Sequence, residues 1–326
     1  MVISSPGDLV FDDVFLELRE VLEDTPVFVK LEGFSLSGSI KVKSALRMVE
    51  RLELEGRLSP GNALIESSSG NLGLALAMVC ASKGYPFICV SDPNISPQTA
   101  KLIEAYGARL MLVNQRDRNG GFLGSRIELI ERLLDEDPQL VWTNQYGNIN
   151  NVEAHYLSTA PAILRQFAQP DYVFVGAGTT GTLGGVSRYL RQHSPRTRIV
   201  AVDSVGSVTF GQPSGPRHIP GLGTSQAPAI REYSRYDQLL MVPEAQALHM
   251  CHSLARRGIL LGGSSGTVLA GVRQLAQQIE PGACVVAIAP DLGDRYVDTV
   301  YNPEWVTRHY PDFYSTAPSR PAAIAV

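Results

Sequence analysis

A lysine in a segment rich in serine and glycine is the first residue of this sequence that could perform covalent chemistry. Lys41 follows Ser-Gly-Ser-Ile at positions 37–40 and opens a stretch with helical character over residues 42–54. The positive end of a helix dipole disfavours the protonated form of a nearby lysine. A neutral lysine can attack a carbonyl carbon and form a Schiff base. Lys41 is therefore a candidate nucleophile, and the alternative is an ordinary lysine on the surface of a helix.

A serine-rich loop offers a candidate site for a carboxylate. Ser67, Ser68, Ser69 and Gly70 stand between an expected strand and an expected helix, and Asn71 follows them. Backbone N–H groups and hydroxyls at the start of a helix bind anions, and an α-carboxylate suits such a loop. The Asn71 amide could in addition bind a ring hydroxyl. The alternative is a loop whose serines only cap the helix.

A loop of glycines and threonines after the expected strand 172–175 has the composition of a phosphate site. Glycines let a ligand approach the backbone, and threonines add hydroxyl donors. The segment 176–181 also fits G-x-G-x-x-G, and Asp203 lies 22 residues after the last of these glycines. Taken alone, this spacing slightly favours a dinucleotide-binding dehydrogenase. The loop residues that could bind phosphate are Gly178, Thr179, Thr180, Gly181 and Thr182.

A fourth loop helps to separate these two classes of enzyme. Residues 261–267 (Leu-Gly-Gly-Ser-Ser-Gly-Thr) open another expected helix and include Ser264. A dehydrogenase has no evident use for Lys41, the serine-rich loop and this loop together. An enzyme of pyridoxal 5'-phosphate needs a Schiff-base lysine, a carboxylate loop, a phosphate site and a partner for the pyridine nitrogen. The combination predicts this cofactor, with small amino acids as substrates.

Strands and helices that alternate along the chain must position these loops. Short apolar or β-branched runs predict the strands, and segments with helical periodicity separate them. Such alternation is typical of an α/β fold with parallel-rich open sheets, which we expect in two lobes. Ligands of such folds bind beyond the carboxyl ends of the strands. The expected strands are Ala63–Glu66, Phe87–Ser91, Arg109–Val113, Tyr172–Val175, Ile199–Asp203, Leu239–Val242 and Cys284–Ala289.

The composition argues against several other classes of protein. The formal net charge of the 326 residues is −4, which argues against nucleic acid as a partner. No apolar stretch approaches the roughly 18–20 residues of a membrane span, and the first twenty residues lack the pattern of a secretory signal. The four cysteines are scattered, and His249 and His252 lack a third ligand nearby. We therefore expect a cytoplasmic protein with reduced thiols and no metal site.

With these loops, the sequence resembles the fold-type II pyridoxal-phosphate enzymes over about residues 20–300. This is the superfamily of cysteine synthase and cystathionine β-synthase. The resemblance implies a tryptophan synthase β-like fold and a homodimer. The roles that it implies are the Schiff-base lysine for Lys41, the substrate-carboxylate loop for Ser67–Gly70, the ring-hydroxyl contact for Asn71, the phosphate loop for Gly178–Thr182, the pyridine-nitrogen contact for Ser264 and a substrate contact for Gln145.

Two lobes and a tail follow from this reading. We expect residues 38–150 to form a smaller, mobile lobe on the substrate side, and residues 1–37 and 151–312 a larger lobe that binds the cofactor. Residues 313–326 have the composition of a loosely ordered tail. Where the family usually has Asp-Arg after its lysine, this chain has Val42 and Lys43. Two residues along a helix turn by about 200°, so only one of the two lysines can face the cofactor, and the Gly-Ser spacing favours Lys41.

Segments 94–97, 120–126, 144–146, 206–211 and 290–296 are similar to the 2,3-diaminopropionate branch of the superfamily. Enzymes of that branch make N-(2-amino-2-carboxyethyl)-L-glutamate from O-phospho-L-serine and L-glutamate, for siderophores or peptide antibiotics. A phosphate leaving group needs a fixed cation, for which Arg126 is the candidate; the alternative is a solvated helix arginine. Tyr146 is a candidate donor to the departing group or the incoming amine, or else an ordinary packed tyrosine. Arg217 and Ser207 are candidate donors to the carboxylates of glutamate.

Three other functions stay open from the sequence. The nearest is a cysteine synthase that uses O-acetylserine or O-phosphoserine with sulfide. A second is a scaffold that binds the cofactor and docks a partner without catalysis, which the complete set of lysine and anion loops argues against. The third is the dehydrogenase that Asp203 supports.

Overall fold

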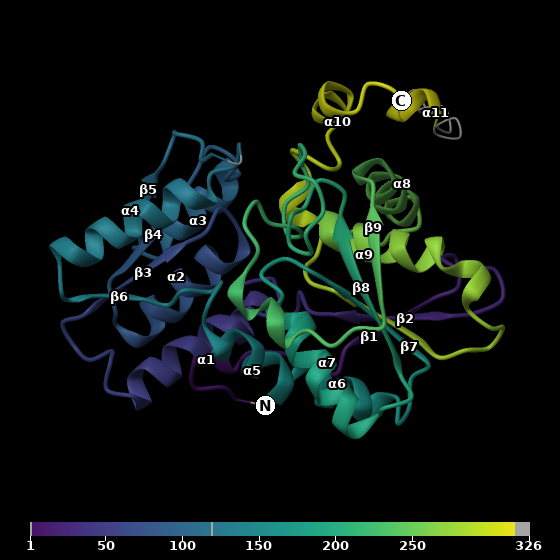
Figure 1. Ribbon diagram of the computed structural model, residues 1–326, viewed down its shortest axis with the longest axis horizontal. Helices are drawn as coiled ribbons and strands as arrows, with labels where there is room; N and C mark the ends of the chain where they lie inside the picture. The colour runs from purple at the N-terminus through teal and green to yellow at the C-terminus, as the bar shows by residue number, and fades with distance from the viewer. Residues whose placement is uncertain (1, 119, 317–326) are drawn as a thin grey trace.

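The computed structural model describes residues 2–118 and 120–316, which build two open sheets covered by helices (Figure 1). The larger sheet has the order β1-β2-β10-β7-β8-β9, and its strands pair in parallel except β1 with β2. The smaller sheet has the order β5-β4-β3-β6 and is parallel throughout. The strands are β1 (Phe15–Leu18), β2 (Val27–Leu31), β3 (Ala63–Ser67), β4 (Phe87–Ser91), β5 (Arg109–Leu112), β6 (Leu140–Trp142), β7 (Tyr172–Gly176), β8 (Arg198–Ser204), β9 (Gln238–Val242) and β10 (Val285–Ala289).

Helices fill the connections between the parallel strands, as right-handed crossovers require. The α-helices are α1 (Lys41–Leu54), α2 (Asn71–Lys83), α3 (Pro97–Ala105), α4 (Leu123–Glu136), α5 (Ile149–Leu157), α6 (Thr159–Gln166), α7 (Gly181–His193), α8 (Glu244–Ala255), α9 (Gly263–Gln274), α10 (Pro303–His309) and α11 (Phe313–Thr316). Short 3-10 helices are η1 (Pro6–Asp8), η2 (Ala229–Tyr233), η3 (Ala276–Gln278) and η4 (Asp294–Tyr296).

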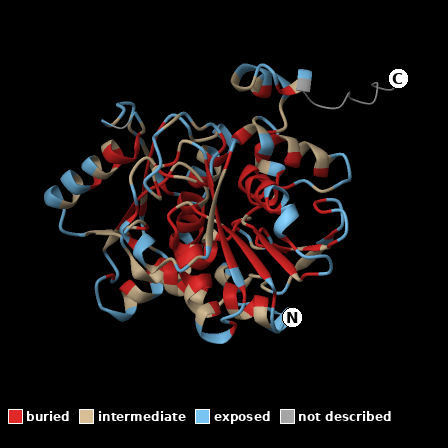
Figure 2. Cartoon of the chain, turned by 45° about the vertical axis from the view of Figure 1, so that its right-hand side comes forward, coloured by how far each residue is buried: buried red, intermediate tan, exposed pale blue. Residues whose placement is uncertain are grey.

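Successive residues of a strand point to opposite faces of its sheet, and here both faces meet helices. In the smaller sheet, Leu64 belongs to the core formed with α1 and α2, whereas Ile65 packs with Ile130 of α4. In the larger sheet, Phe174 faces the core that includes α9, and Val175 faces the core that includes α7. Burial on both faces explains the continuous apolar sequences of these strands, which are buried throughout most of their length (Figure 2).

The predicted α/β fold with parallel-rich sheets is confirmed, and each of the seven expected strands is present within one or two residues. Three strands were not expected, namely β1, β2 and β6. They are short, and Lys30 interrupts the apolar pattern of β2 although its side chain is fully buried. The division into a lobe of residues 38–150 and a larger lobe stays a prediction, although the four-stranded sheet lies wholly within residues 63–142.

The first residues of the predicted tail, Phe313–Thr316, form helix α11. The Phe313 ring stacks on His249, with centroids 4.3 Å apart, and is only 2% exposed. The rest of the predicted tail, residues 317–326, lies outside the described residues.

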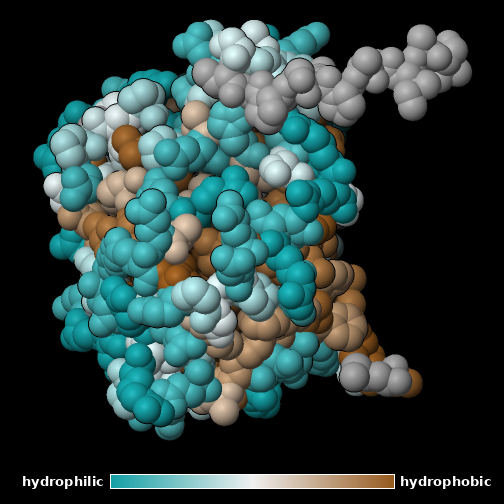
Figure 3. Space-filling view, turned by 90° about the vertical axis from the view of Figure 1, so that its right-hand side faces the viewer, coloured by the Kyte–Doolittle hydropathy of each residue, from teal (hydrophilic) through white to brown (hydrophobic). Residues whose placement is uncertain are grey.

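The surface combines polar and apolar areas. The face drawn in Figure 3 is mainly hydrophilic, with hydrophobic residues gathered in parts of it. In residues 2–118 and 120–316, no helix is both long and apolar enough to cross a membrane.

Candidate active site

A pocket between the two sheets brings together the starts of four helices. Lys41 begins α1, Asn71 begins α2, Gly181 begins α7, and Ser264 is the second residue of α9. Helix starts present free N–H groups and a partial positive charge, which suits an anionic ligand. The residues that line the pocket are Ile40, Lys41, Asn71, Gly176, Gly178, Thr179, Thr180, Gly181, Thr182, Gly221, Leu222, Ser264 and Pro290.

Lys41 is the cation of this pocket. Burial lowers the pKa of its amine to about 8, and the negative charge of Asp291 opposes this shift. An amine with such a pKa is partly neutral near pH 8, and the neutral form is the nucleophile. The environment of Lys41 thus suits attack on a carbonyl carbon.

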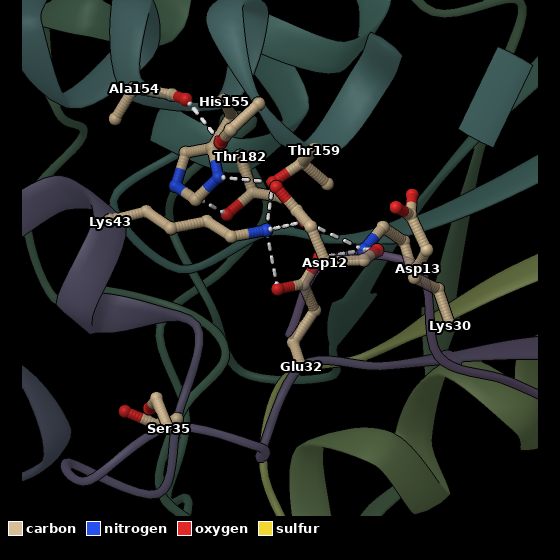
Figure 4. A network of polar contacts seen from close by, with 12 residues as sticks. Asp12, Asp13, Lys30, Glu32, Ser35, Lys43, Ala154, His155, Thr159 and Thr182 are labelled. Atoms are coloured by element: carbon tan, nitrogen blue, oxygen red, sulfur yellow. Dashed lines mark hydrogen bonds and ion pairs between the residues drawn. The ribbon is translucent and has the colours of Figure 1, made fainter. Parts of the chain in front are cut away.

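Lys43 has a different environment although it is only two residues away. Its ammonium group forms ion pairs with Glu32, at 2.6 Å, and with Asp12 (Figure 4). Lys30 binds the same two carboxylates, with its Nζ 3.0 Å from Asp12 Oδ1 and 2.8 Å from Glu32 Oε1. Two lysines and two acids therefore form a buried cluster of balanced charge. We call these four residues the ion cluster.

A buried histidine connects the ion cluster to the start of α7. Lys43 Nζ donates to Thr159 Oγ1 at 3.1 Å, and the same oxygen lies 3.0 Å from His155 Nδ1. On the other side of the ring, Nε2 lies 3.1 Å from Ser44 Oγ and 3.2 Å from Thr182 Oγ1. Burial, and then the charge of Lys43, lower the pKa of His155 well below its ordinary value, so its ring is neutral. Sequence reasoning assigned His155 no role, since a lone histidine gives no sign of such partners.

The loop before α7 fits a phosphate monoester. Thr180 caps the helix in the left-handed conformation, with φ +69°, and its buried Oγ1 has no hydrogen-bond partner within the described chain. A side chain at Gly178 would place its Cβ 2.7 Å from the Gly221 carbonyl oxygen, so glycine keeps this cradle open. Thr179 Oγ1 accepts a hydrogen bond from Asn151 at 3.0 Å, which leaves the Thr179 proton available for a ligand. A phosphate oxygen would satisfy these groups.

The serine-rich loop is partly engaged in its own structure. Ser68 Oγ accepts hydrogen bonds from the N–H groups of Gly70 and Gly73, at 3.2 and 2.9 Å, and so caps α2. Ser67 Oγ is buried without a hydrogen-bond partner among the described residues. Gln145 Nε2 donates to the Ser67 carbonyl at 2.7 Å, which places Gln145 against this loop. Ser69 is half-buried beside Gly70, so both remain accessible to a ligand.

Ser264 and Asn71 also line the pocket. Ser264 is 2% exposed, and a Cβ at Gly221 would lie 3.1 Å from its Oγ. Its hydroxyl is a neutral group able to meet a ring nitrogen. Asn71 Nδ2 donates to Asp291 Oδ2 at 2.7 Å, which fixes the plane of the amide. The donor set of the pocket therefore fits pyridoxal phosphate.

Arg126 and Tyr146 lie together but do not contribute to the lining of this pocket. Arg126 is buried, which contradicts the alternative of a solvated helix arginine. Its Nη1 lies 3.4 Å from Asp92 Oδ2, and its Nε and Nη1 have no hydrogen-bond partner in the described part of the chain. Burial raises the pKa of Tyr146, so its hydroxyl keeps its proton. These two side chains could donate hydrogen bonds to an anionic group of the substrate.

The two candidate donors for glutamate differ in availability. Ser207 Oγ donates to Thr209 Oγ1 at 2.9 Å and is fully buried. Arg217 Nη1 donates to the Leu222 carbonyl at 3.1 Å, while its buried Nε has no partner among the residues described. Arg217 therefore retains a donor next to a pocket residue.

Pocket residues that the sequence reasoning missed are mostly backbone contributors. Gly221 and Leu222 come from an irregular segment between β8 and β9, where no pattern marks a ligand site. Pro290 directly follows β10, so its position at the carboxyl end of a strand was a usable signal.

Comparisons with known proteins agree with this geometry. The profile of the family described as pyridoxal-phosphate dependent enzyme matches residues 15–291. N-(2-amino-2-carboxyethyl)-L-glutamate synthase of Cupriavidus metallidurans is 41% identical over 94% of this chain and 92% of its own. The synthase of the same name from Ralstonia nicotianae is 43% identical over 86% of this chain and 84% of its own.

Solved structures give the same result. O-ureido-L-serine synthase superposes with a TM-score of 0.84 at 33% identity, covering 93% of this chain and 96% of that one. Cysteine synthase of Entamoeba histolytica superposes with a TM-score of 0.85 at 28% identity, covering 98% and 93%. The fold is thus that of the cysteine synthase-like, fold-type II enzymes, and the chain belongs to the family of pyridoxal-phosphate dependent enzymes.

Proposed function

We propose that this enzyme replaces the phosphate of O-phospho-L-serine by the amino group of L-glutamate. The products are N-(2-amino-2-carboxyethyl)-L-glutamate and phosphate. The observation that carries the proposal is the pocket that joins Lys41, Asn71, the phosphate loop and Ser264, in a chain more than 40% identical to two synthases of that product. Membership of the family excludes the dehydrogenase.

The residues of the pocket would hold the cofactor by complementary groups. The start of α7 with Thr179, Thr180 and Thr182 would bind its phosphate, Ser264 its ring nitrogen and Asn71 its ring hydroxyl. When bound, pyridoxal phosphate supplies an aldehyde that attaches an amino acid and a ring that accepts electrons from its Cα. Ser264 is uncharged, so it does not force a proton onto the ring nitrogen. This limits the electron demand of the ring and favours elimination of a β-substituent over transamination.

Lys41 would act twice in this site. As a neutral amine it would attach the cofactor, and as a free amine it would remove the α-proton of the substrate at Nζ. The loop Ser67–Gly70 would meanwhile hold the α-carboxylate, with the Ser67 hydroxyl, which has no hydrogen-bond partner among the described residues, as one donor and Gln145 supporting the loop. These contacts would orient the Cα–H bond toward Lys41.

Arg126 and Tyr146 would serve the leaving phosphate. A buried guanidinium whose Nε has no hydrogen-bond partner in the described part of the chain suits a doubly charged phosphate better than a singly charged acetate. Tyr146 would donate its proton to the departing oxygen. Movement of the predicted smaller lobe, residues 38–150, would bring Arg126 and Tyr146 to the substrate. Arg217, whose Nε has no hydrogen-bond partner in residues 2–118 and 120–316, would bind a carboxylate of glutamate.

We further propose a homodimer in the cytoplasm that serves the formation of 2,3-diaminopropionate for a siderophore or peptide antibiotic. Support for the dimer is a group of exposed apolar side chains on adjoining segments, where Phe11 N–H bonds to the Phe34 carbonyl at 3.1 Å and Leu36 follows. Light scattering during gel filtration should give twice the chain mass of 35.3 kDa. A mass of one chain would refute the dimer.

The function is tested by phosphate release from O-phosphoserine with and without L-glutamate. We expect release to depend on glutamate and an adduct with the mass of N-(2-amino-2-carboxyethyl)-L-glutamate to form in equal amount. D-Glutamate serves as the matched control nucleophile and should give little adduct. Release without any adduct would mean that the enzyme only eliminates phosphate, and the proposal would fail.

A further inference from the structure

A buried carboxyl group for which the proposed mechanism has no role lies against the segment that carries Lys41. Asp291 follows the end of β10 and is 1% exposed. Its backbone pairs with Ser39 in an isolated antiparallel bridge. The carbonyl of the preceding Pro290 accepts a hydrogen bond from Ile40 N–H at 2.8 Å. These two backbone contacts hold Asp291 against the segment that carries Lys41.

The two oxygens of the Asp291 side chain have different partners. Oδ2 accepts hydrogen bonds from Asn71 Nδ2, at 2.7 Å, and from the Tyr296 hydroxyl. Oδ1 is buried and has no hydrogen-bond partner in residues 2–118 and 120–316. A Cβ at Gly262 would lie 1.9 Å from Oδ1, so only glycine at that position leaves room for the carboxyl group. A buried carboxyl oxygen in such a place calls for a function, because an unpaired one is costly.

Two cations interact with this carboxyl group: the charge of Arg295 lowers the pKa of Asp291, and the charge of Asp291 raises the pKa of Lys41. Arg295, on the same loop, donates from Nη2 to the carbonyls of Ser37 and Gly38, at 2.9 and 2.7 Å. Burial lowers the pKa of Lys41, and the carboxylate of Asp291 raises it again. Burial raises the pKa of Asp291, against the effect of its two donors. The other titratable groups that interact with this pair are Asp294, Tyr296, Tyr301, Cys251 and His155.

We propose that Asp291 is a positioning residue that keeps a proton on Nζ of Lys41 and thereby strengthens Lys41 as the base of the reaction. This inference rests on the proposed roles of Lys41. A negative charge buried close to an amine stabilises its ammonium form, which is the product of proton removal from the substrate. Through its bond to Asn71, Asp291 also holds the amide that would meet the ring hydroxyl.

Removal of this charge should have two effects of opposite sign. In Asp291→Asn, Lys41 loses its proton at lower pH, so more of the neutral amine is present at pH 7 to attack the cofactor aldehyde. As a weaker base, however, it removes the α-proton of a bound amino acid more slowly. Damage to the fold would slow both processes, so an increase in one of them identifies the electrostatic role.

The first measurement is the rate at which apoprotein attaches saturating pyridoxal phosphate, followed by the visible absorption band from about pH 6 to 9.5. We expect a midpoint near the Lys41 pKa of about 8 in the natural protein. In Asp291→Asn the midpoint should fall by about one pH unit, which makes cofactor attachment roughly fivefold faster at pH 7. Exchange of the α-proton of bound L-alanine with deuterated water should slow in the same variant.

Two controls separate the possible outcomes. Asp298→Asn removes an exposed carboxylate two residues beyond Tyr296 and should keep the natural midpoint. If Asp291→Asn does not fold, Asp291→Ser should show the same downward shift. Borohydride reduction and peptide mapping should place the pyridoxyl group on Lys41 in every protein. An unchanged midpoint with Lys41 labelled overturns the inference alone, whereas a label on another lysine overturns the proposed function as well.

Discussion

Lys41 and Lys43 belong to the same turn of helix α1 and yet meet opposite environments. Lys41 lines the pocket and is half-buried, and desolvation lowers its pKa to about 8. Lys43 is buried and forms ion pairs with Asp12 and Glu32. The helical turn of about 200° over two residues explains this separation. Reactivity therefore depends on burial without a full counter-charge, and not on the residue type.

Arg126 provides a prediction at the scale of one residue. Loss of one charge-assisted contact to a buried anion costs about 1.5–3 kcal/mol, which is roughly 10- to 150-fold in transition-state binding. Arg126→Ala should lower kcat/KM for O-phosphoserine by about that factor and leave the visible spectrum of the bound cofactor unchanged. Initial rates of phosphate release measure the effect.

Arg132→Ala is the matched control, since Arg132 lies on the same helix, is exposed and pairs only loosely with Glu136, at 4.0 Å. This variant should retain full efficiency. Equal losses in both variants, or none in Arg126→Ala, would remove Arg126 from the phosphate site.

The sequence could predict a site residue only where the local composition around that residue indicates a ligand-binding loop. Lys41, Asn71, Ser264 and the phosphate loop stand in glycine- and serine-rich loops, and the structure gathers them in one pocket. Asp291 was visible only as one residue in a similar segment, because its importance arises from contacts to Asn71 and Tyr296, which are distant or unmarked in sequence. Such partners become apparent only when the fold is known.

The site is built from residues at the N-termini of helices. Two of these helices follow loops that begin at the carboxyl ends of strands. The loop before α2 follows β3, and the loop before α7 follows β7, each at the carboxyl end of a parallel strand. Strong alternation of strands and helices made this arrangement predictable. The strands β1, β2 and β6 were not predictable in the same way, since they have three to five residues and take their order from pairing with neighbours.

Gly178 gives a prediction for the phosphate loop. A methyl group there would lie 2.7 Å from the Gly221 carbonyl oxygen and would push the two segments apart. Such overpacking costs about 1–3 kcal/mol, so Gly178→Ala should weaken cofactor binding by roughly 5- to 150-fold. Titration of apoprotein with pyridoxal phosphate measures the affinity.

Gly282→Ala is the control for this variant, because a Cβ there meets no atom within 4 Å although its φ of +78° is strained. It should lower stability slightly and leave cofactor affinity unchanged. Unaltered affinity in Gly178→Ala would show that this loop does not cradle the phosphate.

The ion cluster joins three elements, namely the N-terminal segment through Asp12, β2 through Lys30 and Glu32, and α1 through Lys43. Lys43→Met would leave a buried negative charge without its partner. Breaking such a pair costs about 3–5 kcal/mol, and urea unfolding should show a loss of that size. The cofactor should still attach to Lys41.

Lys83→Met removes a partly exposed ion pair with Glu53 and should cost about 0–1 kcal/mol. If Lys43→Met were no less stable than Lys83→Met, the cluster would not secure these elements.

Over the whole molecule, two sheets with separate helical layers meet at the pocket, and the candidate groups for substrate and cofactor come from both of them. Lys41, Asn71, Arg126 and Gln145 belong to the part of the chain that we predict to move, residues 38–150. The phosphate loop and Ser264 belong to the larger part. Closure would exclude water from the site and bring Arg126 to the leaving group.

The central claim is the identity of the reaction. An experiment in which two leaving groups and two nucleophiles compete tests it. The enzyme with pyridoxal phosphate receives O-phosphoserine, O-acetylserine, L-glutamate and sulfide together, and mass spectrometry follows all products. We predict N-(2-amino-2-carboxyethyl)-L-glutamate as the main product, with phosphate released in equal amount and O-acetylserine largely unused. Cysteine formed mainly from O-acetylserine would contradict the proposal and identify the enzyme as a cysteine synthase.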